Sequence, residues 1–210
     1  MQFLKHQTND YIWLQLRKKK FRFKQYICIC YMFNPLADSP YIRALDFDFD
    51  VLEKEIIDFS RQGQIILAGD LNARTVACQI LLQKIMTITF PFLMITTQTE
   101  KISHRRSKDN TLTSRGLQLN KLCLQMGWRI LNGRFFGDSL GQFTSYRYNG
   151  SSVIDYFIVS ESLLDNISFF KVHIFNGLMS EHCKISMMLN INCFIHVSNP
   201  KLHIFPDRYK

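Results

Sequence analysis

Short segments of the N-terminal half are rich in apolar residues, which predicts strands of a sheet. Tyr11–Leu16 is one such segment. Tyr26–Met32 is a second, and it is apolar on both faces, as is typical of a central strand. The basic run Arg17–Lys20 between them predicts a turn. Gln64–Ala68 predicts a short buried strand that ends in Gly-Asp.

Two helices are predicted from apolar residues three or four positions apart. The first spans Asp46–Gln62, ends before Gly63, and has an apolar stripe made of Phe49, Leu52, Ile56 and Phe59. The second starts at Thr113 or Ser114, either of which can cap it, and ends at Gly127. Its inward residues are expected to be Leu119, Leu122, Cys123 and Met126. Further strands are expected near Trp128–Leu131, Phe143–Tyr148, Val153–Val159, Phe169–Phe175 and Lys184–Ile195.

The order of these elements indicates a layered α/β fold in one domain, residues 9–190, because no repeat or linker divides the chain. Within this domain, residues 75–111 are divergent: apolar residues 80–95 have no clear period, and residues 99–110 are polar and basic. This part is interpreted as a surface insertion or an eroded segment. An irregular tail is expected over residues 191–210.

Composition excludes several classes of protein. With 47% hydrophobic and 20% charged residues, the 210-residue chain is neither disordered, collagen-like nor a coiled coil. The net charge of +9 favours a polyanionic partner, although a solvating surface explains it almost as well. Residues 1–30 hold seven Lys/Arg against one Asp, whereas residues 31–72 hold three against eight acidic residues. An acidic block beside basic sequence suits a site for metal ions and phosphates, or simply an amphiphilic surface.

The six cysteines form no C-x-x-C pair and no zinc-ligand spacing. Cys28 and Cys30 are expected to share one strand face as buried, reduced thiols. Reduced thiols point to an intracellular place, nuclear or cytoplasmic. No apolar stretch reaches 18 residues, and the N-terminus is not apolar as a signal peptide would be, so no contact with a membrane is expected.

Two groups of polar residues are candidates for chemistry. Asp70 and Asn72 follow a buried strand, so the carboxylate can accept a proton from water while the amide holds that water or a phosphate oxygen. Gly-Asp and Asn are also common turn residues. Asp155 lies in an apolar strand and needs a partner, which a ring N–H of His182 can provide. A structural contact of Asp155 with a tyrosine or the backbone is the alternative.

Several motifs occur together in one order, and they resemble the endonuclease domain of LINE-type (non-LTR) retrotransposons, within the endonuclease/exonuclease/phosphatase family. The motifs are the strand Tyr26–Tyr31, Gly69-Asp70-Leu71-Asn72-Ala73-Arg74, Ser114-Arg115-Gly116, Gly127–Arg134, Asn149–Tyr156 and Ser180-Glu181-His182. The resemblance implies a four-layer αββα sandwich that cleaves phosphodiesters with Mg²⁺ or Mn²⁺.

The resemblance also implies roles for single residues. Asp70 resembles the residue that activates the attacking water, and Asn72 its companion at the scissile phosphate. His182 resembles the histidine that stabilises the developing charge, and Asp155 the carboxylate that orients it. Tyr31 matches a tyrosine that contacts phosphate. Apart from the resemblance, positive charge makes the basic N-terminus, Arg74 and the run His104–Lys108 candidates for contact with backbone phosphates.

Two departures from the family pattern affect the expected activity. Glu181, which we expect near the metal, stands where the family normally has Asp. The metal-binding Glu of the family's first strands has no counterpart before Glu53, so the domain is interpreted as truncated at its N-terminus.

The hypothesis is therefore a DNA-nicking endonuclease of retrotransposon origin whose activity and metal binding are reduced or lost. It is expected to be a monomer that acts with a reverse transcriptase region of the same element. The alternative is an inactive remnant that at most binds nucleic acid.

Overall fold

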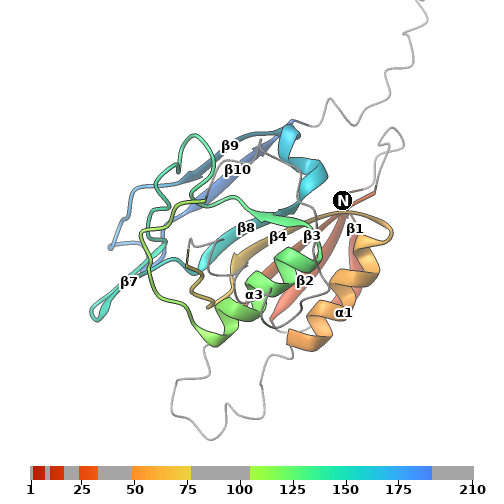
Figure 1. The fold of residues 1–210 in the computed structure, drawn as a ribbon, viewed down its shortest axis with the longest axis horizontal. Helices are drawn as coiled ribbons and strands as arrows, with labels where there is room; N and C mark the ends of the chain where they lie inside the picture. The colour runs from red at the N-terminus through yellow and green to blue at the C-terminus, as the bar shows by residue number, and fades with distance from the viewer. Residues whose placement is uncertain (1, 8–9, 17–23, 33–48, 77–104, 191–210) are drawn as a thin grey trace, which may run out of the picture.

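A computed structural model describes residues 2–7, 10–16, 24–32, 49–76 and 105–190 (Figure 1). Its central feature is a six-stranded sheet in the order β1-β2-β3-β4-β8-β5. The strands are β1 (Gln2–Gln7), β2 (Tyr11–Leu16), β3 (Lys24–Tyr31), β4 (Gly63–Asp70), β8 (Asp155–Ser160) and β5 (Trp128–Ile130). Only β3 and β4 pair in parallel; the other neighbours are antiparallel.

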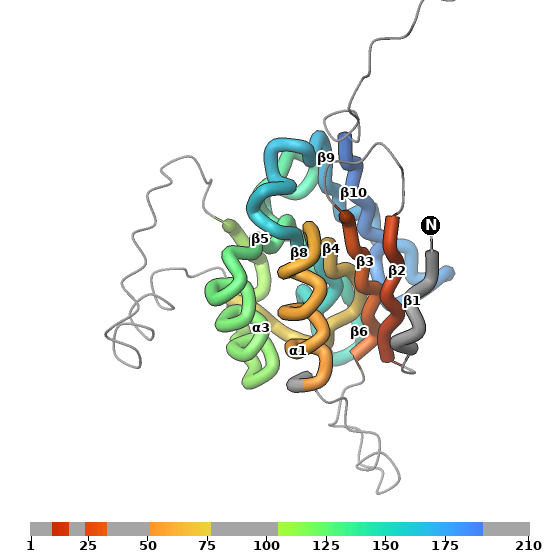
Figure 2. Tube along the Cα trace, turned by 90° about the vertical axis from the view of Figure 1, so that its right-hand side faces the viewer, coloured from red at the N-terminus to blue at the C-terminus, as the bar shows by residue number. Residues whose placement is uncertain are grey.

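Two helices, α1 (Phe49–Ser60) and α3 (Ser114–Gln125), cover one face of this sheet (Figure 2). They bury the apolar faces expected from their sequence: Leu52 and Ile56 of α1 and Leu119 and Leu122 of α3 join one core with the inward residues of β3, β4 and β8. Thr113 caps α3 by accepting a hydrogen bond from the N–H of Gly116. The crossover from β3 through α1 to β4 explains why these two strands run in parallel.

The other face of the sheet carries a second, smaller core. It is covered by the 3-10 helix Glu161–Asn166 and by a two-stranded sheet of β9 (Ile167–Val172) and β10 (Ile185–Leu189). A separate hairpin pairs β6 (Ser145–Arg147) with β7 (Gly150–Ser152). Figures 1 and 2 show the helices, the large sheet and β9–β10 as successive layers. The mixed α/β architecture is confirmed, whereas a fourth layer is not seen among the described residues and stays a prediction.

Several boundaries differ from those expected from the sequence. β1 pairs with β2, so the sheet begins before the expected boundary at residue 9. More than half of the residues of β1 are polar, so the sequence shows no clear apolar pattern there. The strand is recognised only from its pairing with β2. The proposed tail over residues 191–210, the basic turn Arg17–Lys20 and most of the divergent segment lie outside the described residues. None of the described helices is long and apolar enough to cross a membrane.

The thiols behave as expected in the described part of the chain. Cys28 and Cys30 lie on the helix-facing side of β3, are almost fully buried and remain free, with their sulfur atoms 3.4 Å apart. Burial raises the pKa of the Cys28 thiol well above its usual range, which keeps it protonated and unreactive.

Candidate functional site

Asp70 is the last residue of β4, and its position depends on the close approach of β3. Gly69 has φ +126, and a Cβ there would collide with the carbonyl oxygen of Cys30, so only glycine fits. Asn72 has φ +43, a left-handed conformation that Asn tolerates better than most residues. Its N–H donates to Asp70 Oδ1 at 2.8 Å, and its side-chain amide donates to the carbonyl of Met32. The strand end is therefore a fixed turn rather than a loose loop.

The predicted contact between Asp155 and His182 is present. Nδ1 of His182 lies 3.1 Å from both carboxylate oxygens of Asp155, while its Nε2 lies 4.0 Å from Oδ2 of Asp70. Asp155 begins β8 and is the antiparallel partner of Asp70 in β4. The structure thus brings together three side chains that are up to 112 positions apart in the sequence, counting from Asp70 to His182.

A buried threonine, not singled out by the sequence, holds this arrangement in place. Oγ1 of Thr144 accepts the N–H groups of Ile154 and Asp155, each at 3.0 Å. Its carbonyl accepts the N–H of Cys183 at 2.7 Å, next to His182. Thr144 is fully buried and connects the segments that carry the two functional side chains. In the sequence Thr144 is only a hydroxyl residue near the start of an expected strand. Such residues are common, so nothing marked Thr144 as important.

Asn132 is a second positioning residue that sequence reasoning missed. It is fully buried, and its amide donates to the carbonyl of Asp155 at 3.0 Å. It belongs to one of the motifs that carry the resemblance, Gly127–Arg134, so the signal was the motif rather than a recognisable chemical pattern.

The electrostatics of the site favour a proton on Asp70. Burial above all, and the neighbouring Asp155, raise the pKa of Asp70 to about 6, although the Asn72 N–H and His182 act to lower it. A carboxylate whose pKa lies near neutrality can both accept and release a proton at physiological pH. This is the property that a general base needs.

Arg74, which we expected to contact phosphate, instead forms an ion pair with Asp109 inside the protein. Asp109 was not among the candidate residues of the sequence analysis. The Nε and Nη2 of Arg74 donate to the two carboxylate oxygens of Asp109 at 2.8 and 2.7 Å. Asp109 also accepts the N–H of Val153 at 2.9 Å, two residues before Asp155. We call Arg74, Asp109 and Val153 the clasp. It ties the chain after Asn72 to the chain before Asp155.

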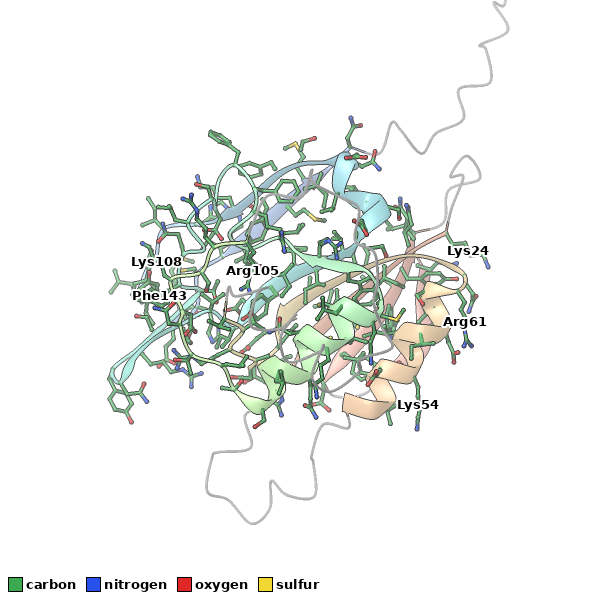
Figure 3. All side chains as sticks on the ribbon, in the orientation of Figure 1. Lys24, Lys54, Arg61, Arg105, Lys108 and Phe143 are labelled. Atoms are coloured by element: carbon green, nitrogen blue, oxygen red, sulfur yellow. The ribbon has the colours of Figure 1, made fainter. Side chains whose placement is uncertain are left out.

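Other expected site residues are found in different surroundings. Tyr31 is 57% exposed and is the β3 partner of Asp70, so it lies beside the site. Glu181 does not join Asp70, Asp155 and His182; its carboxylate pairs with Arg147 at 3.2 Å. Arg105 is not a surface residue available to phosphates: it is 7% exposed and donates to the carbonyls of Asn132 and Thr75. Figure 3 shows Arg105 in the interior and Lys108 toward the edge.

The cluster of Asp70, Asp155 and His182 offers few ligand atoms for a divalent cation. Among the described residues, ligand atoms of Asp70, Asp155 and His182 lie within 4.8 Å of one another. The two oxygens of Asp155 share Nδ1 of His182, and the two oxygens of Asp70 accept the N–H and the side-chain amide of Asn72, so each carboxylate oxygen of the cluster already has a hydrogen-bond partner. Magnesium is commonly held by one or two carboxylates together with water and phosphate oxygens. The residues therefore fit a weakly held ion that uses the remaining lone pairs of these carboxylates together with water and phosphate oxygens.

Comparison with solved structures finds several with a fold similar to that of this chain. The endonuclease domain of TRAS1, a telomere-specific non-LTR retrotransposon, is matched over 88% of this chain and 65% of its own, at 21% identity and a TM-score of 0.52. The 3′ phosphatase NExo from Neisseria, bound to a product DNA hairpin, is matched over 86% and 64% at 14% identity, TM-score 0.54. The 3′-5′ exonuclease NExo from Neisseria meningitidis is matched over 79% and 61% at 15% identity, TM-score 0.50.

These matches show that the chain has the fold of the endonuclease/exonuclease/phosphatase group, as the motifs predicted. The chain spans just under two thirds of the length of each of these structures. No protein-family model and no curated protein matches the sequence.

Proposed function

We propose that this chain is a divalent-metal-dependent nuclease that nicks DNA, with Asp70 as its general base. The observation that carries the proposal is the buried Asp70 carboxylate, whose pKa is raised to about 6 and which faces a histidine already oriented by Asp155. The fold shared with the TRAS1 endonuclease domain and NExo supports a nuclease rather than an unrelated use of the same residues.

Each residue of the site has a role in phosphodiester hydrolysis. Asp70 accepts the proton of the attacking water. Asp155 accepts from Nδ1 of His182 and leaves Nε2 facing Asp70. In the doubly protonated imidazolium form Nε2 can donate to a phosphate oxygen as negative charge develops. Asn72 is placed beside Asp70 by its backbone hydrogen bond and is the natural contact for a second phosphate oxygen. Tyr31, exposed at the end of β3, is a further candidate for phosphate contact.

A divalent cation held by a remaining lone pair of Asp155 would, when bound, neutralise negative charge on the phosphate and leave Asp70 to act as the base. Magnesium or manganese is proposed on the oxygen-rich donors, with Glu181 at most an outer contributor because it pairs with Arg147. Because each carboxylate oxygen of the cluster already has a hydrogen-bond partner, we expect weak metal binding and slow turnover. The same proposal includes a retrotransposon origin and a reverse transcriptase in the same element. It also includes a nuclear or cytoplasmic location and a monomeric state.

The test is the nicking of supercoiled plasmid by the purified chain. We expect slow, single-strand nicking with Mg²⁺ or Mn²⁺ that EDTA abolishes. Asp70→Asn and His182→Ala should each lower the rate at least about a hundredfold, since a general base and a charge-stabilising donor commonly contribute that much. Asp58→Ala is the matched control, because Asp58 is an exposed acidic residue of α1, remote from the site.

The alternative function, binding of nucleic acid without cleavage, is favoured by the sparse metal donors. It predicts that the folded chain retards DNA in a gel at low salt but produces no nicks with either metal. Nicking that persists unchanged in Asp70→Asn would overturn the assignment of the base and indicate a contaminating nuclease.

A further inference from the structure

Positive charge is concentrated in one described segment of the chain. Residues 105–134 hold seven Lys/Arg and a single acidic residue, Asp109. Asp109 is already paired with Arg74 of another segment, so it offsets none of this charge. The neighbouring helix α1, on the same face of the sheet as α3, instead holds four acidic residues and one lysine (Figure 2). A polyanion is therefore attracted to the side of residues 105–134 and repelled from α1.

Within this segment, residues 106–108 are held firmly against two glycines. The N–H of Arg106 donates to the carbonyl of Gly133 at 3.0 Å, and the N–H of Lys108 donates to the carbonyl of Gly141 at 2.8 Å. A Cβ at either glycine would collide with the carbonyl oxygen of Arg106, so the close approach depends on glycine at both positions. We call Arg106–Lys108 the basic strip. Its backbone is fixed independently of its two cationic side chains.

Both cations of the basic strip are exposed, and neither has an acidic partner among the residues that the structure describes. The ammonium group of Lys108 donates to the amide oxygen of Gln142 at 2.6 Å, which orients the lysine without cancelling its charge. The nearby Arg74 and Arg105 differ, because their guanidinium groups are bound inside the protein. The basic strip therefore presents two uncancelled charges from a fixed backbone, an arrangement suited to phosphate oxygens.

The basic strip is also close to the proposed chemistry. The next residue, Asp109, accepts the N–H of Val153, two residues before Asp155. Along this path the Cα atoms of Lys108 and Asp155 are at most about 20 Å apart. One strand of a duplex advances about 3.4 Å per phosphate along its axis, so this separation is spanned by about six nucleotides.

We propose that the basic strip binds the phosphate backbone of a nucleic-acid strand whose scissile phosphate lies at Asp70 and His182. This inference rests on the proposed function and adds the class of substrate: an extended strand with several nucleotides on one side of the cut, rather than a small phosphate ester. A phosphate chain is favoured over an acidic protein because the neighbouring site is itself suited to a phosphodiester. The fixed backbone of the basic strip reduces the ordering that binding requires.

The experiment measures the salt dependence of DNA binding separately from cleavage. The probe is a fluorescently labelled duplex of about two helical turns, and its anisotropy is followed in EDTA between about 50 and 200 mM KCl. The test variant is the double substitution Arg106→Gln and Lys108→Gln. Each phosphate contact contributes about 0.9 to the slope of log affinity against log salt concentration, so the slope should decrease by about 1.8. Binding at about 0.1 M salt should weaken at least about tenfold.

Two further variants are matched to this one. Lys54→Gln with Arg61→Gln removes the same charge from the opposite edge of the molecule, as Figure 3 shows, and should leave the slope unchanged. Arg106→Lys with Lys108→Arg keeps both charges and should retain the slope of the parent. All four side chains are exposed, so the melting temperature should remain the same in every variant.

Three outcomes overturn the inference. They are an unchanged slope in the test variant, an equal decrease in the variant of Lys54 and Arg61, and competition by polyglutamate that is as effective as competition by unlabelled duplex. The last would identify an acidic protein as the partner. Failure of the proposed function has a different signature, because the parent would then bind with the salt slope that the test variant loses but would not nick DNA when Mg²⁺ is added.

Discussion

Two buried aspartates, Asp70 and Asp109, show how differently one side chain can be used in this molecule. Both are nearly inaccessible, at 8% and 1% exposure. Asp109 receives two hydrogen bonds from Arg74 and others from backbone N–H groups, and these outweigh the effect of burial and hold its pKa below the usual value. Asp70 has Asp155 as a neighbour and its nearest ring nitrogen at 4.0 Å, so burial dominates and its pKa rises to about 6.

The ion-paired Asp109 and the reactive Asp70 belong to one connected part of the structure. The clasp contacts the chain two residues after Asn72 and two residues before Asp155. An ion pair satisfied in this way stabilises the ends of the two segments that carry the site. The site can then hold a carboxylate in an environment that disfavours its charge, as functional sites commonly do.

Breaking the clasp should have the largest effect on stability. Asp109→Ala leaves the Arg74 guanidinium and the Val153 N–H without their partner, so the free energy of unfolding should fall by about 3–5 kcal/mol. Urea unfolding followed by circular dichroism measures this loss. The matched control is Asp58→Ala, which removes a solvent-exposed ion pair with Arg61 and should cost at most about 1 kcal/mol. Equal losses in both variants would show that the clasp is not a buried, satisfied contact.

Replacing each aspartate by asparagine should change the free energy of unfolding at pH 7.5 in opposite directions. In the folded chain Asp70 keeps its proton up to about pH 6, against 3.8 for an unperturbed side chain, so this group destabilises the fold increasingly from pH 4 to 6 and fully above. Asp70→Asn should therefore raise the free energy of unfolding by about 2 kcal/mol at pH 7.5 and change little at pH 4.

Asp109→Asn is the mirror variant. Because the folded pKa of Asp109 is lowered, its ionised form stabilises the fold above its unfolded pKa, and this contribution disappears as the pH falls through the folded value. The variant should lose stability at pH 7.5. Thermal melts of both variants at pH 7.5 and at pH 4.5 test the pair, and a loss in Asp70→Asn at pH 7.5 would contradict the raised pKa.

The smallest expected effect lies at the edge of the clasp. Oγ1 of Thr113 accepts the N–H of Arg74 and caps α3 through the N–H of Gly116, each at 3.1 Å. Thr113→Val keeps the shape and removes the hydroxyl, which should lower the free energy of unfolding by about 1 kcal/mol. Thr113→Ser restores the oxygen and should recover most of the loss. If Val and Ser behave alike in urea unfolding, the hydroxyl does not act as the cap.

Much of the fold follows from local pattern. The periodicity of α1 and α3 and the cap at Thr113 are properties of a few neighbouring residues, and the structure has them where the sequence predicts them. The apolar strands β2, β3, β4 and β8 are also found, because a buried strand needs apolar residues on at least one face. β6 lies within the strand expected near Phe143–Tyr148, whereas β1 and β7 are short or polar, so their pairing depends on neighbours that no local pattern reveals.

The candidate site was predicted in part. Asp70, Asn72, Asp155 and His182 follow from motif order, and their grouping at one edge of the sheet is found. Their catalytic roles, and those of Tyr31 and Arg74, remain predictions. The partners of Arg74 and Glu181 could not be foreseen, because ion pairs between distant segments depend on how loops meet in space.

Apolar periodicity, helix caps and motif order are local properties, so the residues of the main strands and helices and the candidate chemical side chains can be read from the chain alone. The environment of each charged side chain depends on how distant segments pack together. Whether a buried aspartate is a clasp or a base depends on the few ångströms to its nearest cation: Asp109 has Arg74 at 2.7 Å, and Asp70 has Asp155 beside it in β8. That distance arises from strand register and loop packing, which act across the whole chain.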